Sequence, residues 1–514
     1  ILATAHSDCA GRVPSLHCAC MLDNLNADRY EGVLQGYWEG ILAGNSAQVH
    51  FNCANISVFE DLVDRFSSDL TEEHQILSVR VPVTTGSEPY APFLGLIAAE
   101  LSHRGIAPQD AVKQAGVFAY QQDLFVSALS EEMPHRREEL IFDELSNEIE
   151  QAHKSLYSLL KLLARDLPLI VSVSALQRAP ASGLAFVEWL SRRHPSGNIL
   201  FVLGYHREHR YFSDERNERL EAFVSRIEER HSILDLYCSD CQDDSETERL
   251  PDESLDDAAF IELGQKNLNM MCFAEARSVV SGVTSGGLQV ERSRIRAWAD
   301  LCIGEPEQAL VEAQSAIELA GEKGDPALIS ELYRVAAYAC LQKNDPSNAT
   351  RYANECRLWA IRSESQVYLL WSYFAQYQIA DRRTELIARN DYFTLIDMLR
   401  EQALEHHLGY VCKNAYFYLE YFDRMEDMEA LVDSAIEISR KNGNRFGLAR
   451  DYHQRAIMHT YRDQYPEALE FFDRSRKIRE ELGDSLELIR VYNGVAYVFM
   501  LLEEYKQAFD NLHR

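Results

Sequence analysis

Residue types that bind metals or act as nucleophiles occur in small groups in this chain. Cys9, Cys18 and Cys20 lie near the amino terminus, and Cys238 and Cys241 form a CxxC pair. Thiolates can hold zinc, but a structural zinc site needs four ligands. The amino-terminal cysteines do not have the spacing of a common zinc motif, and no second pair follows the CxxC. The sequence contains no Gly-x-Ser-x-Gly and no His-Glu-x-x-His motif. We therefore expect reduced thiols, no metal site, no cofactor and no catalytic set.

The stretch 167–207 indicates the elements that would position a site. Residues 169–173 and 199–203 are short apolar runs of the kind found in buried strands. Residues 181–193 between them have helical apolar spacing, with two arginines in the last turn. Two such strands joined by a helix predict a βαβ unit in a parallel sheet.

This stretch resembles the second half of the nucleotide-binding domain of STAND-type AAA+ ATPases, the class that includes the maltose-regulator-like bacterial activators. The residues that keep the family's frame are Leu176, Gln177, Ala179, Gly204 and Arg207. The family has metal-binding and water-activating carboxylates where this chain has Ser174 and Ala175. A Mg·ATP site needs anionic oxygens there to hold the metal and orient water. The resemblance therefore implies a degenerate domain that does not hydrolyse ATP.

The phosphate loop of that family corresponds to the segment between a predicted strand, 48–51, and a predicted helix, 58–66. At the family's glycine and lysine positions the chain has Asn52, Asn55, Ser57 and Val58. No glycine occurs between Gly44 and Gly86, and no lysine precedes Lys113. Such a loop needs glycines so that backbone N–H groups can face the phosphates, and a lysine to neutralise them. We expect no phosphate loop of the standard kind.

Other segments also fit the resemblance. Residues 75–81 read as a strand, and the string SEPYAPFL at 87–94, which is similar to the family at this place, precedes an apolar helix at 94–102. A long helix is expected at 139–164 and a last strand at 232–237. The family normally has a winged-helix region before its repeats, for which this chain has no room. The resemblance thus predicts a degenerate P-loop-like α/β domain with a parallel sheet.

Charge and composition exclude several functions. The 514 residues carry a formal net charge of -30, from 51 basic and 81 acidic side chains. Such an anion repels nucleic acid and anionic membranes unless basic residues are segregated, and only short basic pairs occur. No apolar run reaches the ~18 residues of a membrane span. The 11 cysteines are odd in number and suit a reducing compartment. We expect a cytoplasmic protein that contacts neither nucleic acid nor membrane directly.

From residue 257 the pattern changes to helix pairs with a recurring small residue. The positions are Ala276, Ala309, Ala349, Ala430, Ala468 and Ala508, with a divergent unit near 392–395. Their intervals are close to, or somewhat longer than, the roughly 34-residue period of tetratricopeptide repeats. In such repeats small residues let the paired helices approach closely. The resemblance predicts an all-α tetratricopeptide superhelix of about seven helix pairs after the α/β domain.

The predicted organisation has four parts: an amino-terminal segment at 1–26, the α/β domain at 27–239, an acidic linker at 240–256 and the repeats at 257–514. The chain starts without methionine and stops within the last helix pair without a polar cap. We therefore expect the natural protein to continue, with further repeats or an effector domain.

These observations predict a non-catalytic regulatory or scaffold protein, and the resemblance implies a role in bacterial signal transduction. Its partner would be a protein or another domain of the same polypeptide, and a homodimer is left open. The tyrosines chosen as candidate anchors for a partner are Tyr416, Tyr418, Tyr421, Tyr452 and Tyr492. Two alternatives remain: a sensor that binds a nucleotide or small ligand without hydrolysis, and the regulatory part of a larger enzyme or transcription regulator. The positions that the resemblance assigns to the degenerate nucleotide site are Asn52, Asn55, Ser57, Val58, Ser174, Ala175 and Arg207.

Overall fold

The computed structural model describes residues 27–53, 56–73, 76–82, 89–130, 141, 145–193, 196–207, 214–236, 256–321, 323–382, 387–412, 425–482 and 484–513. The chain forms two compact units. The first comprises 1–115, 126–132 and 156–255, and the second comprises 116–125, 133–155 and 256–514. The cysteines at 9, 18, 20, 238 and 241, and nearly all of the predicted linker, lie outside the described residues.

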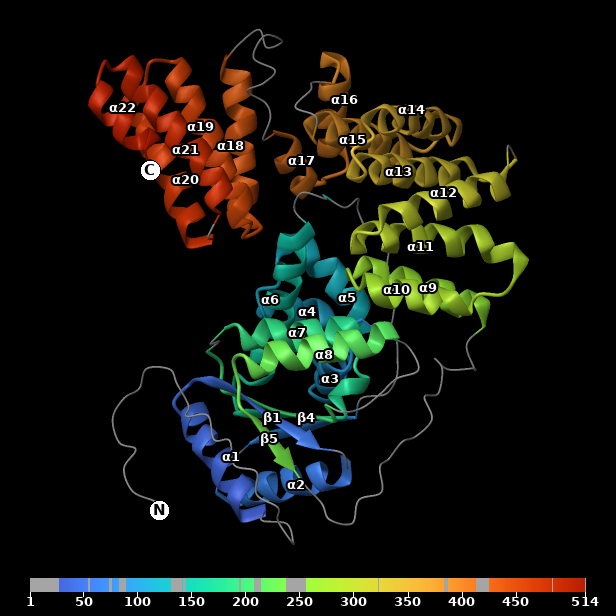
Figure 1. Ribbon diagram of the computed structural model, residues 1–514, viewed down its shortest axis with the longest axis vertical. Helices are drawn as coiled ribbons and strands as arrows, with labels where there is room; N and C mark the ends of the chain where they lie inside the picture. Colours follow the sequence, from blue (N-terminus) through green and yellow to red (C-terminus); the bar gives the residue numbers. More distant parts are fainter. Residues whose placement is uncertain are drawn as a thin grey trace. The chain divides into compact units, whose positions relative to one another are not determined.

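The first unit contains a five-stranded sheet in the order β2-β3-β4-β1-β5, and all its described pairings are parallel (Figure 1). The strands are β1 (Ser46–Cys53), β2 (Leu77–Pro82), β3 (Leu169–Ser174), β4 (Ile199–Tyr205) and β5 (Ile233–Leu236). Every residue of β3 and β4 is buried, as expected for parallel strands covered on both faces. The predicted α/β fold with a parallel sheet is confirmed.

Helices cover both faces of this sheet, and the side chains of β4 alternate between them. Leu200 and Val202 pack with α1 (Ala27–Leu42) and α2 (Ile56–Glu73), whereas the Phe201 ring lies 6.4 Å from the Phe93 ring. Phe93 begins α3 (Phe93–His103) and also meets Phe186 of α7 (Ala181–Ser191). Successive side chains alternate between the two faces because the backbone of a strand is pleated. The remaining helices of this part of the chain are α4 (Pro108–Gln114), α5 (Gln122–Ser130), α6 (Leu145–Leu163) and α8 (Asp214–Glu228).

The second unit is built mainly from helix pairs. The first four pairs are α9 (Asp257–Asn269) with α10 (Phe273–Val279), α11 (Gln289–Ile303) with α12 (Pro306–Ala320), α13 (Pro326–Gln342) with α14 (Pro346–Arg362), and α15 (Gln366–Arg382) with α16 (Arg389–Glu401). The last three are α17 (Glu405–Cys412) with α18 (Met425–Lys441), α19 (Arg445–Tyr461) with α20 (Tyr465–Leu482), and α21 (Ser485–Leu501) with α22 (Tyr505–Leu512). The predicted succession of tetratricopeptide-like repeats is confirmed.

Most of the small residues predicted inside the pairs are buried. Ala276, Ala309, Ala349 and Ala468 have no exposed surface, and Ala508 is also buried. Ala430 is the exception, because it is exposed on α18 and Ala435 of that helix is buried instead. The prediction for Ala430 was wrong: the Glu-Ala-Leu string there resembles the other repeats, but it faces solvent.

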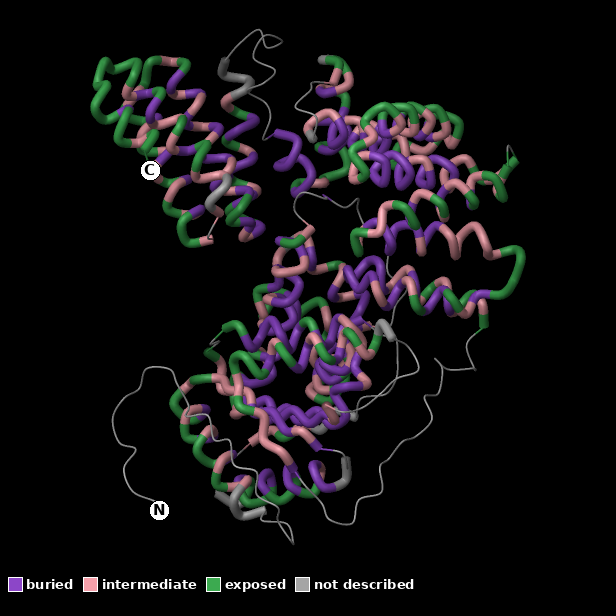
Figure 2. The backbone as a smooth tube through the Cα atoms, in the orientation of Figure 1, coloured by how far each residue is buried: buried purple, intermediate pink, exposed green. Residues whose placement is uncertain are grey.

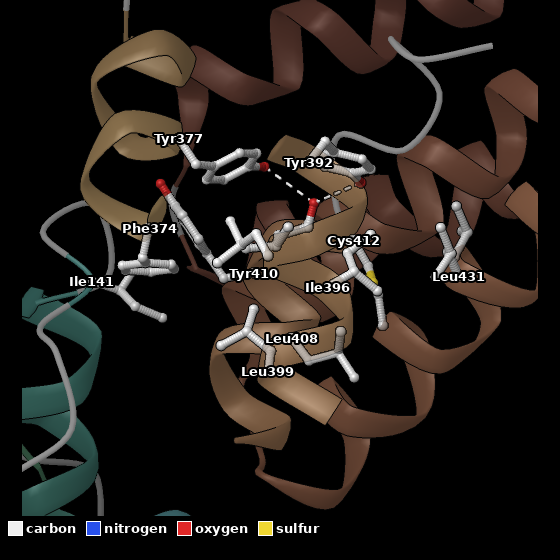
Figure 3. Packing of buried hydrophobic residues seen from close by; sticks show 14 of the residues in the cluster. Ile141, Phe374, Tyr377, Tyr392, Ile396, Leu399, Leu408, Tyr410, Cys412 and Leu431 are labelled. Atoms are coloured by element: carbon white, nitrogen blue, oxygen red, sulfur yellow. Dashed lines mark hydrogen bonds between the residues drawn. The ribbon is translucent and has the colours of Figure 1, made fainter. Parts of the chain in front are cut away.

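The core of the second unit includes a residue from well before the repeats. Ile141 packs into an apolar cluster with residues of α15 to α19, and Figure 3 shows it beside Phe374. In the same cluster the hydroxyls of Tyr377 and Tyr392 both donate to the carbonyl oxygen of Val411, at 3.1 and 3.2 Å. Buried and exposed stretches alternate along most helices of this unit, as the purple and green colours in Figure 2 show.

The segments 116–125 and 145–155 also belong to the second unit, although the sequence places them in the α/β domain. The Tyr120 ring stacks on His406 of α17, with ring centroids 4.5 Å apart. Glu148 Oε1 lies 3.5 Å from His406 Nε2, and Asn147 donates to Asn444 at 3.2 Å. These contacts join parts of the chain hundreds of residues apart. The predicted domain bounds stay a prediction, because the compact units follow a different division.

Candidate functional site

The carboxyl edge of the parallel sheet is the first candidate site, since ligands of such sheets bind outside the carboxyl ends of the strands. Asn52 lies near the end of β1, Ser174 ends β3, and Arg207 follows β4. Asp235 lies on β5 and pairs with Asn52 in the strand register. The structure therefore places Asn52, Ser174 and Arg207, three of the predicted site residues, at the carboxyl edge of the sheet.

Polar groups at this edge bind one another. Asn52 Nδ2 donates to Asp235 Oδ1 at 2.8 Å, and the Arg207 backbone N–H donates to Asn52 Oδ1 at 3.1 Å. The Arg207 guanidinium lies 3.6 Å from Asp235 Oδ1 and 3.6 Å from Glu228 Oε1. Asn52 thus uses both ends of its amide to link β1 to β5 and to the chain after β4.

A second contact closes the end of β3. The hydroxyl of Ser174, which is 3 % exposed, donates to Glu60 Oε1 of α2 at 3.0 Å. Ala175 follows in the left-handed conformation, with φ 56°, and is also buried. A carboxylate is therefore present at this strand end, but it comes from α2. The spacing of sequence motifs could not reveal it, because Glu60 and Ser174 are 114 positions apart.

Val58, which the resemblance to STAND ATPases would align with the lysine of their phosphate loop, does not face this edge. Its side chain is buried in the apolar cluster of α1, α2 and the sheet. Asn55 lies outside the described residues, and of Ser57 only the helical backbone is described. The described part of α2 therefore offers a buried aliphatic residue where a phosphate-binding cation would stand.

Buried polar side chains also lie within the sheet. His50 of β1 has no exposed surface, and its ring lies 5.1 Å from the His231 ring and 6.1 Å from the Tyr205 ring. Burial, together with a smaller effect of the nearby His231, lowers the pKa of His50 to about 3. Burial raises the pKa of Tyr205. Both groups are neutral near pH 7, and His50 makes this region sensitive to acid because its protonation would place a charge in the buried sheet.

Among the described residues no group of three or more His, Cys, Asp or Glu side chains could hold a metal ion. His206 uses its backbone N–H to donate to Gln177 Oε1 at 3.1 Å. The described cysteines are Cys53, Cys272, Cys302, Cys340, Cys356 and Cys412, and all of them are free thiols. None of the described helices is long and apolar enough to cross a membrane.

The repeats form the second candidate site. Tyr416, Tyr418 and Tyr421 lie outside the described residues. Tyr452 is 7 % exposed and its hydroxyl accepts from Arg440 at 2.7 Å, so its ring belongs to the core. Tyr492 is half-buried, with its hydroxyl 3.5 Å from Glu480 Oε1. Of the predicted anchors that are described, only Tyr492 keeps part of its ring accessible.

The structure exposes other large apolar side chains that were not selected from the sequence. On α21 and α22 these are Ile489, Tyr497, Met500, Leu501, Tyr505, Phe509 and Leu512, with exposed fractions from 42 to 67 %. An alignment of the last two repeats could have found several of them. It would have shown which positions are covered by the next helix in one repeat and uncovered in the other.

Comparison with known families supports the repeats. A tetratricopeptide repeat model matches residues 448–514, which span most of α19 and all of α20 to α22. The last two helix pairs match the tetratricopeptide repeat. No curated protein matches the chain.

Three solved structures illustrate the likeness in three dimensions. The STAND protein with a tetratricopeptide repeat sensor from Pyrococcus horikoshii is 9 % identical, with a TM-score of 0.46, covering 96 % of this chain and 89 % of the other. Aspartyl phosphate phosphatase F from Bacillus subtilis is 11 % identical, with a TM-score of 0.36, and the match covers 84 % of this chain and 93 % of the other. The human IFIT1 dimer with m7Gppp-AAAA is 11 % identical, with a TM-score of 0.30, and the match covers 79 % of this chain and 93 % of the other. All three TM-scores lie below 0.5.

Proposed function

We propose that this chain is a non-catalytic regulatory or scaffold protein of bacterial signal transduction, and that its tetratricopeptide solenoid binds protein partners. The observation that carries the proposal is the continuous series of helix pairs from α9 to α22. Stacked pairs build extended surfaces to which each repeat adds side chains, and such surfaces serve binding. The net charge of -30 favours a partner segment with basic residues, whose binding weakens as salt screens the charges.

The proposal also holds that the α/β domain does not hydrolyse ATP. Its support is the polar network at the strand ends. Ser174 is bound to Glu60, and Asn52 is bound to Asp235 and to the backbone of Arg207. A phosphate entering this edge would meet the carboxylates of Glu60 and Asp235. The cation present, Arg207, already lies 3.6 Å from Asp235 and from Glu228, and Val58 supplies no further positive charge. The domain then acts as a packed scaffold.

The test of this proposal has two arms, both with the whole chain. In the first, phosphate release is measured with Mg·ATP, and we expect the rate of a protein-free blank for the chain and for Ser174→Ala alike. Steady turnover that disappears in Ser174→Ala would show a working hydrolytic site. ATP binding without turnover would favour the ligand-sensor alternative.

In the second arm a protein captured by the whole chain is purified and its affinity measured at low and high ionic strength. We expect tighter binding at low salt and a loss on Tyr492→Ala. Tyr37→Ala, the same change at another half-buried tyrosine in the first unit, serves as the control. If Tyr37→Ala abolishes binding and Tyr492→Ala does not, recognition resides in the α/β unit and the proposed roles are reversed.

A further inference from the structure

Helix α14 has an exposed stripe that contains no carboxylate. Leu358 and Ile361 are 52 and 56 % exposed, and they lie about one turn apart on the helix. Glu355, the only acidic residue of α14, is half-buried. Green stretches on α14 in Figure 2 mark exposed residues. We call the exposed residues of this helix the α14 stripe; they are Pro346, Ser347, Thr350, Arg351, Asn354, Leu358, Ile361 and Arg362.

The α14 stripe carries two arginines, one in its first half and one at its end. Arg351 and Arg362 are about three turns apart, or ~16 Å along a helix, so they project from the same side. Each guanidinium carbon lies 4.6 Å from the centre of a neighbouring ring, Arg351 over Tyr352 and Arg362 over Trp359. Among the described residues no carboxylate lies within ion-pair distance of either guanidinium. Stacking on the rings restricts both cations and leaves their N–H groups to a ligand.

The second helices of other repeats differ from α14, because they have carboxylates at exposed positions. These are Glu307 and Glu318 on α12, Asp397 and Glu401 on α16, and Glu467, Glu470, Glu480 and Glu481 on α20. Acidic outer positions are expected in a chain whose formal net charge is -30. α14 reverses the sign locally, since it contains three arginines and one glutamate. A cationic stripe on an anionic protein attracts an anionic ligand to one place.

We propose that the α14 stripe binds an acidic segment of a protein partner. Two carboxylates of this segment bind Arg351 and Arg362, and an aliphatic side chain between them covers Leu358 and Ile361. Charge complementarity decides the class of partner, because arginine binds carboxylates through paired N–H donors in a fork geometry. The two aliphatic side chains between the cations add apolar surface that leaves water on binding.

The inference rests on the proposed role in protein binding and adds a second surface to it. The net charge favours a basic partner segment elsewhere on the chain, whereas the α14 stripe selects an acidic one. α14 lies between α13 and α15, and its stripe stays exposed in the presence of these neighbours. A nucleic acid is a poorer occupant, because its phosphates would extend towards the exposed carboxylates of α12 and α16.

A helical peptide of alanine and glutamine with a pair of glutamates near each end is a direct probe of the stripe. The pairs are placed about 11 positions apart, with leucines between them, to match the spacing of the two arginines. Labelled with a fluorophore and followed by anisotropy, the peptide should bind the whole chain, more tightly at low salt. The net charge of -30 repels this peptide on average, so its binding reports a local cationic site.

The combined change Arg351→Ala and Arg362→Ala should weaken this binding at least about tenfold, because both carboxylate contacts are lost. Its charge-matched control is Arg400→Ala combined with Arg490→Ala. These two arginine side chains are 52 and 71 % exposed, and each already has a carboxylate close by on its own helix. The control should bind the peptide as the parent chain does.

The apolar part of the contact is tested separately. Leu358→Ser should weaken peptide binding, whereas Leu319→Ser, at a 60 % exposed position of α12, should not. Thermal melting shows that each variant keeps its fold.

The inference is overturned if the peptide does not bind, or if the Arg351 and Arg362 double variant binds it as the parent does. Self-association that this variant abolishes would assign the stripe to a second copy and overturn it as well. Binding that appears only after the acidic residues at 243–253 are changed to glutamine or asparagine would assign the stripe to this chain's own segment. A chain that captures a protein partner but not the peptide keeps the proposed function and loses the α14 stripe alone.

Discussion

A single buried histidine makes the first unit sensitive to pH. His50 has no exposed surface, and neither ring nitrogen has a hydrogen-bond partner among the described residues. Burial lowers its pKa from 6.5 to about 3, so the folded protein keeps it neutral while the unfolded chain takes up a proton. Stability is therefore fully present above pH 6.5 and is lost as the pH falls from 6.5 towards 3. His153 and His453, whose pKa values burial lowers to about 4, act in the same direction.

Replacing His50 by an apolar side chain should remove part of this dependence. Between pH 6.5 and pH 4 we expect His50→Leu to reduce the loss in free energy of unfolding by roughly 3 kcal/mol. Urea unfolding midpoints at the two pH values measure the change. His103→Leu, at an exposed position, is the control and should keep the slope of the parent chain. If both variants lose stability in acid as the parent does, other groups govern the transition.

At the scale of one element, the position of α7 depends on a glycine. A Cβ at Gly183 would overlap the backbone carbonyl oxygen of Ala91, which cannot move as a flexible side chain can. Gly95, in α3, has nothing within 4 Å of its Cβ position and is exposed. An alanine at Gly95 therefore tests helix propensity alone, whereas an alanine at Gly183 tests helix propensity together with the steric overlap.

Gly95→Ala should raise stability by up to ~1 kcal/mol, because alanine is the better helix former. Gly183→Ala has the same gain in propensity, but it should lower stability by ~2 kcal/mol or more because α7 must shift away from residues 90–92. Thermal melting followed by circular dichroism compares the two variants. Equal and favourable effects would contradict the close contact at Gly183.

At the scale of the whole molecule, the repeats do not form their unit alone. Segments 116–125 and 133–155 belong to it, with Tyr120 stacked on His406 and Gln151 donating to the Gly443 carbonyl oxygen at 3.3 Å. A fragment that begins at residue 257 would lack these contacts. Experiments on partner binding are therefore better made with the whole chain than with isolated repeats.

Tyr120→Ala should loosen α17 without unfolding the protein, since the stacked ring and its neighbours cover that short helix. Hydrogen–deuterium exchange should show faster exchange of the α17 amides in this variant. Tyr461→Ala, at a position 63 % exposed on α19, removes the same side chain and should leave α17 unchanged. Unchanged exchange in Tyr120→Ala would show that the stacking does not stabilise α17.

Local pattern was sufficient to predict most elements. The apolar runs at 169–173 and 199–203 became β3 and β4, and the helix predicted at 94–102 became α3 (Phe93–His103). The recurring alanines located the helix pairs because small residues are required wherever paired helices approach closely. The absence of glycine and lysine around Val58, and of carboxylates at Ser174 and Ala175, was also readable without coordinates.

The sequence by itself thus determined the order of the elements and the repeat period, because both depend on residues close together in the chain. Only the tertiary structure decided which side chains meet across long separations. It paired Glu60 with Ser174 and Asn52 with Asp235, and it buried Tyr452 while exposing Phe509. The physical reason is that such pairings depend on how whole elements pack, and periodic spacing within one element carries no information about its neighbours.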